Sequence, residues 1–268
     1  MILKADKTTT LNGVKVNEYL LTAHNPNRID MPTAKITKPI GVTIHNTAWI
    51  SVASGTTPAE QYTRATYNGN MGDVRVHYYV DDTCAWQNLP LDLSGWHAAD
   101  GDGDGNRKTI AIECIMSSHY DTQDKKSEDN AARLAAYLLN KYNLGIDKLY
   151  THQHWYPPKY CPAYILPHWD KFKALVQKYL SALSEKPVLE TSGYHNGDKT
   201  IGMLAVKELL LIAQKMGIQP KGMYENREYG DGTKNAINYL LNKWGYKQNG
   251  IAGEKFIKKL TAEIKKKI

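Results

Sequence analysis

The chain has 268 residues, of which 42% are hydrophobic and 23% are charged. This length and composition allow a buried core without disulfide bonds and exclude a wholly disordered chain. The longest uninterrupted apolar run is six residues, from Leu134 to Leu139. A bilayer span needs about 20 apolar residues, so we expect no stable membrane insertion.

Cysteine content and the first residues indicate a compartment. Three cysteines, an odd number, do not form a disulfide framework. Residues 1–7 lack the basic head and apolar stretch of a secretory signal. We therefore expect synthesis in a reducing cytoplasm.

The net charge of +7 is unevenly distributed along the chain. From Glu185 onward there are 15 basic and 9 acidic residues, so most of the excess lies in the C-terminal third. Such asymmetry is typical of proteins that meet a polyanion, either nucleic acid, an anionic membrane or an anionic cell wall. A solvated tail that only aids solubility fits the same charge pattern.

The first part of the chain opens with strand and helix signals in alternation. The apolar segment 39–44 predicts a buried strand that ends at His45. Thr57 and Glu60 form a capping box with proline at the first helical position, so a helix is expected to begin there. Two further segments have strand composition, residues 74–80 and 108–115.

The pattern continues with a helix capped by Ser127 and ended by Gly145, a short strand over residues 149–152 and a helix opened by Pro167. Alternating strands and helices predict the α/β class, with a mixed central β-sheet flanked by helices.

A boundary is expected near residues 184–196, which are rich in turn-forming residues. Beyond it, three helical segments follow one another, and the first two stop at Gly217 and Gly245. We predict a catalytic domain over residues 1–183, a linker over 184–196 and a small all-α three-helix domain over 197–268.

Two histidines stand where strands are expected to end, the position at which ligand sites collect in α/β sheets. These are His45 and His152, and Cys161 follows nine residues after His152. Two imidazoles and a thiolate suit zinc and leave its fourth position open. Spacing alone favours the other interpretation, a buried cysteine and two surface histidines.

A carboxylate, Glu113, interrupts an apolar strand, where an unpaired charge is costly unless it is functional. Trp96 and His97 lie before Glu113 in the chain, and a glycine-rich loop separates them from its strand. With the segment His45-Asn-Thr-Ala and the later Lys159-Tyr-Cys161-Pro, these motifs occur in an order that resembles the zinc-dependent N-acetylmuramoyl-L-alanine amidases. This family includes many phage endolysins and is related to the peptidoglycan-recognition proteins. The resemblance covers roughly residues 20–183.

The resemblance implies a Zn²⁺ cofactor and a role for each matching residue. His45, His152 and Cys161 match the zinc ligands, Glu113 the general base, and Lys159 the residue that steadies the developing oxyanion. Substrate-contacting positions are implied for His77, Trp96 and His97.

One spacing departs from the family pattern, in which eight residues separate the second histidine from the cysteine. The separation here is nine from His152 and seven from His154. His152 is preferred because it ends the strand, and His154 remains the alternative.

The tail also resembles a known module. The segments 229–236 and 244–253 look like the glycine turns of the three-helix peptidoglycan-binding module. An unrelated helical bundle is the alternative.

The resemblances together imply a hydrolase of bacterial cell-wall peptidoglycan, with no nucleic acid partner. We expect a phage or prophage endolysin, made in the host cytoplasm without a signal peptide and acting on the wall after release. The alternative is a non-catalytic peptidoglycan-recognition protein with the same fold.

Overall fold

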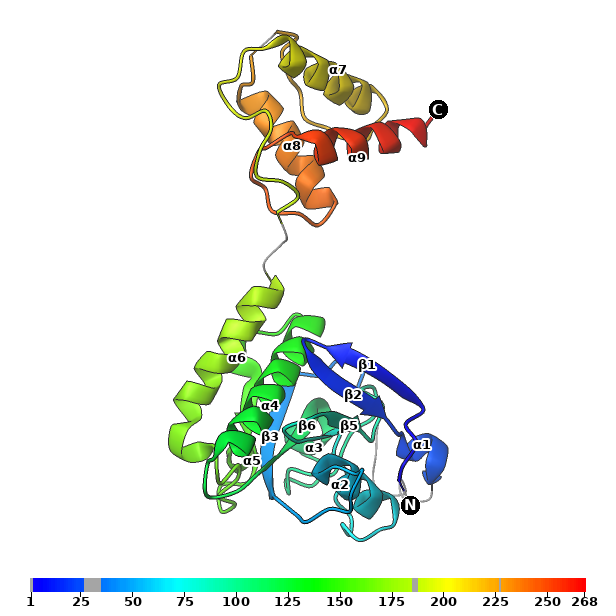
Figure 1. The fold of residues 1–268 in the computed structure, drawn as a ribbon, viewed down its shortest axis with the longest axis vertical. Coiled ribbons are helices and arrows are strands. Elements are labelled where there is room, and N and C mark those ends of the chain that lie inside the picture. Colours follow the sequence, from blue (N-terminus) through cyan, green and yellow to red (C-terminus); the bar gives the residue numbers. More distant parts are fainter. Residues whose placement is uncertain (1, 27–34, 185–187, 227) are drawn as a thin grey trace. The chain divides into compact units, whose positions relative to one another are not determined.

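The structure is a computed structural model that describes residues 2–26, 35–184, 188–226 and 228–268. The chain folds as two compact units, Met1–Ser184 and Glu185–Ile268 (Figure 1). Among the described residues, no helix combines the length and the apolar composition needed to cross a membrane.

Strands and helices alternate through the first unit. Its strands are β1 (Lys7–Leu11), β2 (Val14–Glu18), β3 (Gly41–Ala48), β4 (Tyr78–Val80), β5 (Ala85–Gln87), β6 (Thr109–Met116) and β7 (Leu149–Thr151). Its helices are α1 (Leu21–His24), α2 (Pro58–Tyr67), α3 (Asp104–Lys108), α4 (Thr122–Lys141), α5 (His152–Trp155) and α6 (Trp169–Ser184).

The seven strands of the described residues form one sheet in the order β1-β2-β5-β4-β6-β3-β7. The centre is parallel, because β6 pairs in parallel with β3 and β4, and β3 does so with β7. The pairs β1–β2 and β4–β5 are antiparallel. The predicted mixed sheet is confirmed.

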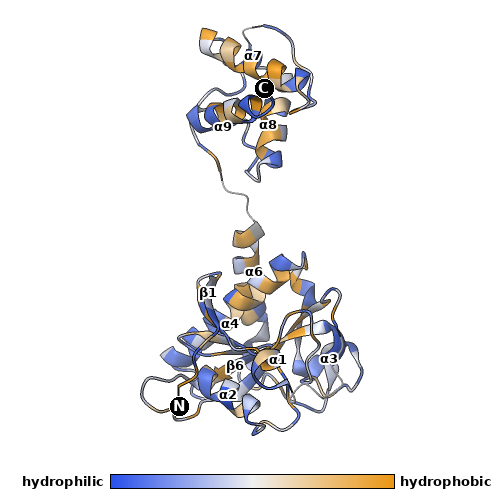
Figure 2. Ribbon diagram, turned by 90° about the vertical axis from the view of Figure 1, so that its right-hand side faces the viewer, coloured by the Kyte–Doolittle hydropathy of each residue, from blue (hydrophilic) through white to orange (hydrophobic). Residues whose placement is uncertain are grey.

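Side chains alternate between the two faces of the central strands. From β3, Val42 and Ile44 enter the main core beneath α4 and α6, whereas Thr43 and His45 point to the opposite face. Figure 2 shows hydrophobic and hydrophilic residues interleaved along α6, as expected for a helix that covers a sheet. Helices α4 and α6 thus cover one face of the sheet, and the opposite face, which packs partly against α2, carries His45.

Several boundaries differ from those predicted. Helix α4 begins at Thr122, because Asp121 caps it by accepting from Gln123 N and Asp124 N, and Ser127 is buried inside it. Strand β3 runs through His45 to Ala48, because β6 pairs with it over its whole length. The hairpin β1–β2 was not predicted, since its threonine-rich first strand lacks an apolar face.

The second unit contains the three predicted helices, α7 (Ile201–Lys215), α8 (Asp231–Lys243) and α9 (Glu254–Lys265). They enclose a core of their own, which includes Leu210, Leu240 and Phe256. Burial of this apolar area is what holds so small a unit together.

Much of the predicted linker packs against this second unit. Glu190 Oε1 accepts from the backbone N–H groups of Gly253 (2.7 Å) and Phe256 (3.0 Å), and its Oε2 accepts from Lys255 (3.1 Å). Glu190 thus caps α9, where a negative charge also suits the helix dipole. A Cβ on Gly253 would lie 2.4 Å from Glu190 Oε2, so the cap requires glycine there.

We expect Glu190→Ala to lower the free energy of unfolding of the second unit by about 1–3 kcal/mol, because three N–H groups lose a charged acceptor. Calorimetry of the whole chain should show a shift only in the transition of that unit. Glu254→Ala, which removes an exposed carboxylate from the same helix, is the control and should change the midpoint much less. Equal shifts in both variants would mean that Glu190 is not the cap.

Candidate metal centre and active site

The centre of the site is a row of side chains on three neighbouring strands. His45 on β3 is the register partner of Glu113 on β6, and Glu113 is the partner of Tyr79 on β4. Paired residues of parallel strands project from the same face. The sheet therefore places an imidazole beside a carboxylate, although the two residues are 68 positions apart.

His152 reaches the same place from the end of β7. Strand β7 pairs with β3, and α5 begins at His152 immediately after it. Two contacts fix this short helix: Thr151 Oγ1 accepts from His154 N at 3.1 Å, and Trp155 Nε1 donates to Thr43 Oγ1 at 2.9 Å. The orientation of the His152 ring thus depends on the hydrogen bond between Trp155 and Thr43 of β3.

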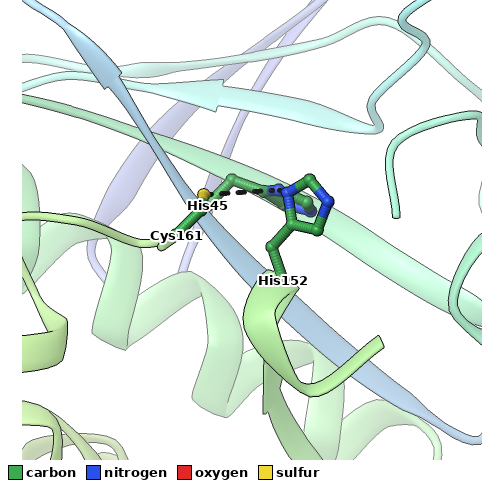
Figure 3. A group of neighbouring side chains, drawn as sticks. All are labelled: His45, His152 and Cys161. Atoms are coloured by element: carbon green, nitrogen blue, oxygen red, sulfur yellow. Dashed lines mark hydrogen bonds between the residues drawn. The ribbon is translucent and has the colours of Figure 1, made fainter. Parts of the chain in front are cut away.

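His45, His152 and Cys161 converge on one point (Figure 3). Their candidate ligand atoms all lie within 4.8 Å of one another, and all three residues are buried. His45 Nδ1 lies 3.0 Å from His152 Nδ1 and 3.9 Å from Cys161 Sγ. His154 is exposed and stacks on the Tyr150 ring instead, with centroids 4.9 Å apart. The structure therefore places His152, rather than His154, beside the other two.

These distances fit a zinc ion. Tetrahedral zinc, with bonds of about 2.1 Å to nitrogen and about 2.3 Å to sulfur, keeps two nitrogens about 3.4 Å apart and a nitrogen and a sulfur about 3.6 Å apart. The observed 3.0 Å and 3.9 Å lie close to both values. A proton on one Nδ1 would link the two rings by a hydrogen bond, and a shared cation would take the place of that proton.

The electrostatics of the three residues agree with this fit. Burial lowers the pKa of His45 and of His152, so both imidazoles are neutral and can act as ligands. Burial, with Glu113 nearby, raises the pKa of Cys161 to about 12. A cation is what would hold that sulfur as a thiolate, so metal binding and loss of the thiol proton are coupled.

Glu113 and Lys159 supply the remaining charges near the centre. The Glu113 Oε2 atom is buried and has no hydrogen-bond partner among the described residues. Burial raises the pKa of Glu113 to about 8, and the Lys159 ammonium opposes that rise. Lys159 is exposed, and its charge also lowers the pKa of His45 and His152, so it lies at the open side of the site.

His97 lies against the metal centre. Its Nδ1 is 3.1 Å from His45 Nε2, the ring nitrogen on the far side from Cys161. Asn106 fixes the loop that carries His97, since its Oδ1 accepts from His97 N at 2.6 Å and Ala98 N at 2.7 Å. An acceptor on the second nitrogen of a ligating histidine sets its tautomer. His97 can therefore orient His45.

The other two residues predicted to contact substrate are placed differently. His77 is 0% exposed; its Nε2 donates to the Leu93 carbonyl at 2.8 Å and its Nδ1 accepts from Ala111 N at 3.1 Å. Both ring nitrogens are thus engaged with the backbone, and the substrate contact at His77 stays a prediction. Trp96 is half-buried, and its main chain pairs with Arg75 at the rim of the sheet.

The contacts of two asparagines that hold the site together were not predicted. Asn106 organises the loop of His97, and Asn46 joins β3 to the segment after Cys161, as described below. Asn46 belongs to the His45-Asn-Thr-Ala motif, but nothing in the local pattern assigns a contact to its side chain or to that of Asn106. Only the histidine, cysteine and carboxylate constellation was visible in the sequence.

Comparison with known proteins agrees with this geometry. Residues 36–164 match the family model described as N-acetylmuramoyl-L-alanine amidase. The chain is 29% identical over 236 residues to the N-acetylmuramoyl-L-alanine amidase CwlH of Bacillus subtilis, which covers 84% of this chain and 88% of CwlH. It is 37% identical over 137 residues to the N-acetylmuramoyl-L-alanine amidase XlyA of the same species. This match covers 51% of this chain and 43% of XlyA. The chain thus spans less than half of the length of XlyA.

Solved structures resemble the first unit. The catalytic domain of XlyA superposes with a TM-score of 0.52 and 32% identity, over 61% of this chain and 99% of that domain. The structure of PlyL gives a TM-score of 0.53 and 30% identity, over 61% of this chain and 98% of PlyL. Sequence, fold and site together place the chain in the N-acetylmuramoyl-L-alanine amidase family.

Proposed function

We propose that the chain hydrolyses the amide bond between N-acetylmuramic acid and L-alanine in bacterial peptidoglycan, as a zinc enzyme. The observation that carries this proposal is the convergence of His45, His152 and Cys161 beside the half-buried Glu113, the register partner of His45. Three protein ligands and an adjacent carboxylate are the arrangement that hydrolytic zinc sites use.

Each residue has a distinct part in the reaction. Bound zinc would polarise the scissile carbonyl and lower the pKa of water there to about 7. Glu113 accepts the proton of the attacking water, and its raised pKa suits it to pass that proton on to the leaving amine near neutral pH. Lys159, at the open side, offsets the negative charge that develops on the carbonyl oxygen. His97 keeps the His45 ring oriented.

Purified cell walls test this function directly. Incubation with the protein should release free L-alanyl amino groups, and elemental analysis should find one zinc per chain. Removal of the metal with a chelator should stop the release, and added zinc should restore it. Binding to walls without release would support the alternative, a non-catalytic peptidoglycan-recognition protein.

The second unit is proposed to anchor the enzyme on the wall. Its excess of basic residues includes the exposed run Lys265-Lys266-Lys267, and its separate core lets it act as a module. Tethering raises the effective concentration of substrate at the active site. With this anchor, we propose a phage or prophage endolysin that is made in the host cytoplasm and acts on the wall after release.

We expect residues 188–268 alone to sediment with purified walls, less at high salt but still measurably. Charge attraction weakens as the Debye length falls from about 10 Å at 0.1 M to about 3 Å at 1 M, whereas contacts of exposed aromatic residues such as Tyr224 persist.

The control changes the three terminal lysines to glutamine, which should remove part of the salt-sensitive binding only. If the fragment did not sediment with walls at low salt, the second unit would not be a wall anchor. If moderate salt abolished its binding, the attraction would be that of a basic patch and not of a specific module.

A further inference from the structure

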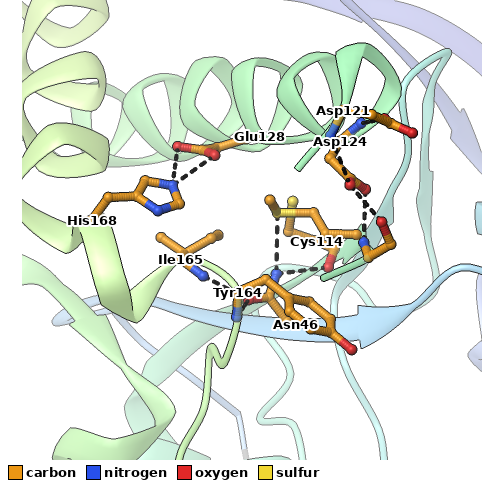
Figure 4. Close-up of polar contacts among 10 residues, drawn as sticks. Asn46, Cys114, Asp121, Asp124, Glu128, Tyr164, Ile165 and His168 are labelled. Atoms are coloured by element: carbon orange, nitrogen blue, oxygen red, sulfur yellow. Dashed lines mark hydrogen bonds and ion pairs between the residues drawn. The ribbon is translucent and has the colours of Figure 1, made fainter. Parts of the chain in front are cut away.

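The side chain of Asn46 joins three segments of the first unit (Figure 4). Its Nδ2 donates to the Cys114 carbonyl at 3.0 Å and contacts Met116 Sδ at 3.4 Å, both on β6. Its Oδ1 accepts from the backbone N–H groups of Tyr164 at 2.9 Å and Ile165 at 3.2 Å. The hydrogen-bonding groups of this amide are thus used between two strands and the turn that follows Cys161.

Asn46 is also close along the chain to the candidate ligands. It follows His45 directly on β3, and its Oδ1 accepts from Tyr164 N, three residues after Cys161. The Cys161 carbonyl in turn accepts from Gln153 N at 2.9 Å, next to His152. One residue therefore connects, through adjacent backbone, to all three candidate ligands.

Cys161 has no regular element to hold it, because it lies between α5 and α6. The turn that follows Cys161 is closed by internal hydrogen bonds, in which Ile165 N and Leu166 N donate to the Pro162 carbonyl. Ile165 anchors that turn in the main core. The Asn46 amide is then the side-chain contact that sets the distance between this turn and β3, and thus between Cys161 and His45.

We propose that Asn46 is a positioning residue that fixes Cys161 for metal binding, through the two N–H groups of Tyr164 and Ile165. This inference rests on the proposed zinc function and adds to it a residue that touches neither substrate nor metal. Partners of this kind typically contribute about 10- to 100-fold to metal affinity.

The test compares zinc affinity in the whole chain by competition with a chromophoric chelator. We expect Asn46→Ala to raise the zinc dissociation constant about 10- to 100-fold. With cobalt in place of zinc, the thiolate-to-metal charge-transfer band should weaken in this variant, because Cys161 is displaced. Asn46→Asp keeps an oxygen for Tyr164 and Ile165 and should lose less affinity than the alanine variant.

The matched control is Asp124→Ala. Asp124 (Figure 4) is a fully buried polar residue that accepts from Ser117 N and Oγ and, outside that view, from Trp49 Nε1. This variant should lower the melting temperature of the metal-free protein but leave the zinc dissociation constant within about threefold of the parent, since it lies outside the ligand network.

Three results would overturn the inference. An unchanged zinc affinity in Asn46→Ala would show that the amide has only a structural role. If Asn46→Asp lost as much zinc affinity as Asn46→Ala, the hydrogen bonds that Oδ1 accepts would not be what positions Cys161. A parent that binds no zinc would overturn the metal centre itself, which distinguishes the two failures. If the alanine variant does not fold, Asn46→Leu, of similar volume and without hydrogen-bonding groups, takes its place.

Discussion

Cys161→Ser is expected to lose zinc and amidase activity together. A serine hydroxyl stays protonated and neutral near neutral pH, so it is a far poorer zinc ligand than a thiolate. Only His45 and His152 would remain, and two imidazoles hold zinc weakly. Elemental analysis after gel filtration and the release of L-alanyl amino groups from walls measure the two losses on the same sample.

Cys84→Ser is the matched control, because the chain offers a second buried thiol away from the centre. All three cysteines are free, and Cys84 contacts the hydroxyl groups of Thr57 and Thr83 rather than the histidines. This variant should keep its zinc and its activity. Full zinc occupancy in Cys161→Ser would contradict the assignment of Cys161 as a ligand, whatever the activity.

The parts of the fold that local patterns determine could be predicted from the sequence. The helix at Pro58 begins where its capping box stands, with Thr57 accepting from Glu60 N. The long apolar strand around Ile112 and the three helices of the tail follow from periodicity in the same way. In each case the signal lies within a few residues of the element that it specifies.

The parts that depend on distant partners could not be predicted. The end of β3 at Ala48 is set by the length of β6, about 70 residues further on. His77 had the residue type of a cleft ligand, but the backbone at Leu93 and Ala111 takes both its nitrogens. Asn46 acts through two N–H groups more than a hundred residues away. Residue type alone carries no information about such contacts.

Glu113→Gln is expected to keep zinc and to lower turnover by about 10²–10⁴, the range for a positioned acid–base group. The amide has almost the same shape as the carboxylate and cannot accept the proton of water. The measurement is single-turnover hydrolysis of a soluble muropeptide by the zinc-loaded variant. Zinc content is determined on the same sample, so that loss of the metal and loss of the base are separated.

A loss of stability cannot account for this effect. The pKa of Glu113 is raised from 4.5 to about 8 in the folded protein, so the folded state holds a proton that the unfolded chain releases. The metal-free parent therefore becomes less stable as pH rises from about 4.5 to about 8, and the uncharged glutamine removes that dependence.

Glu128→Gln is the control, a buried carboxylate on the helix-covered face that pairs with His168 at 3.0 Å. It should leave the hydrolysis rate unchanged. Wall lysis at the parent rate by Glu113→Gln would mean that Glu113 is a structural strand residue, and water would then need another base.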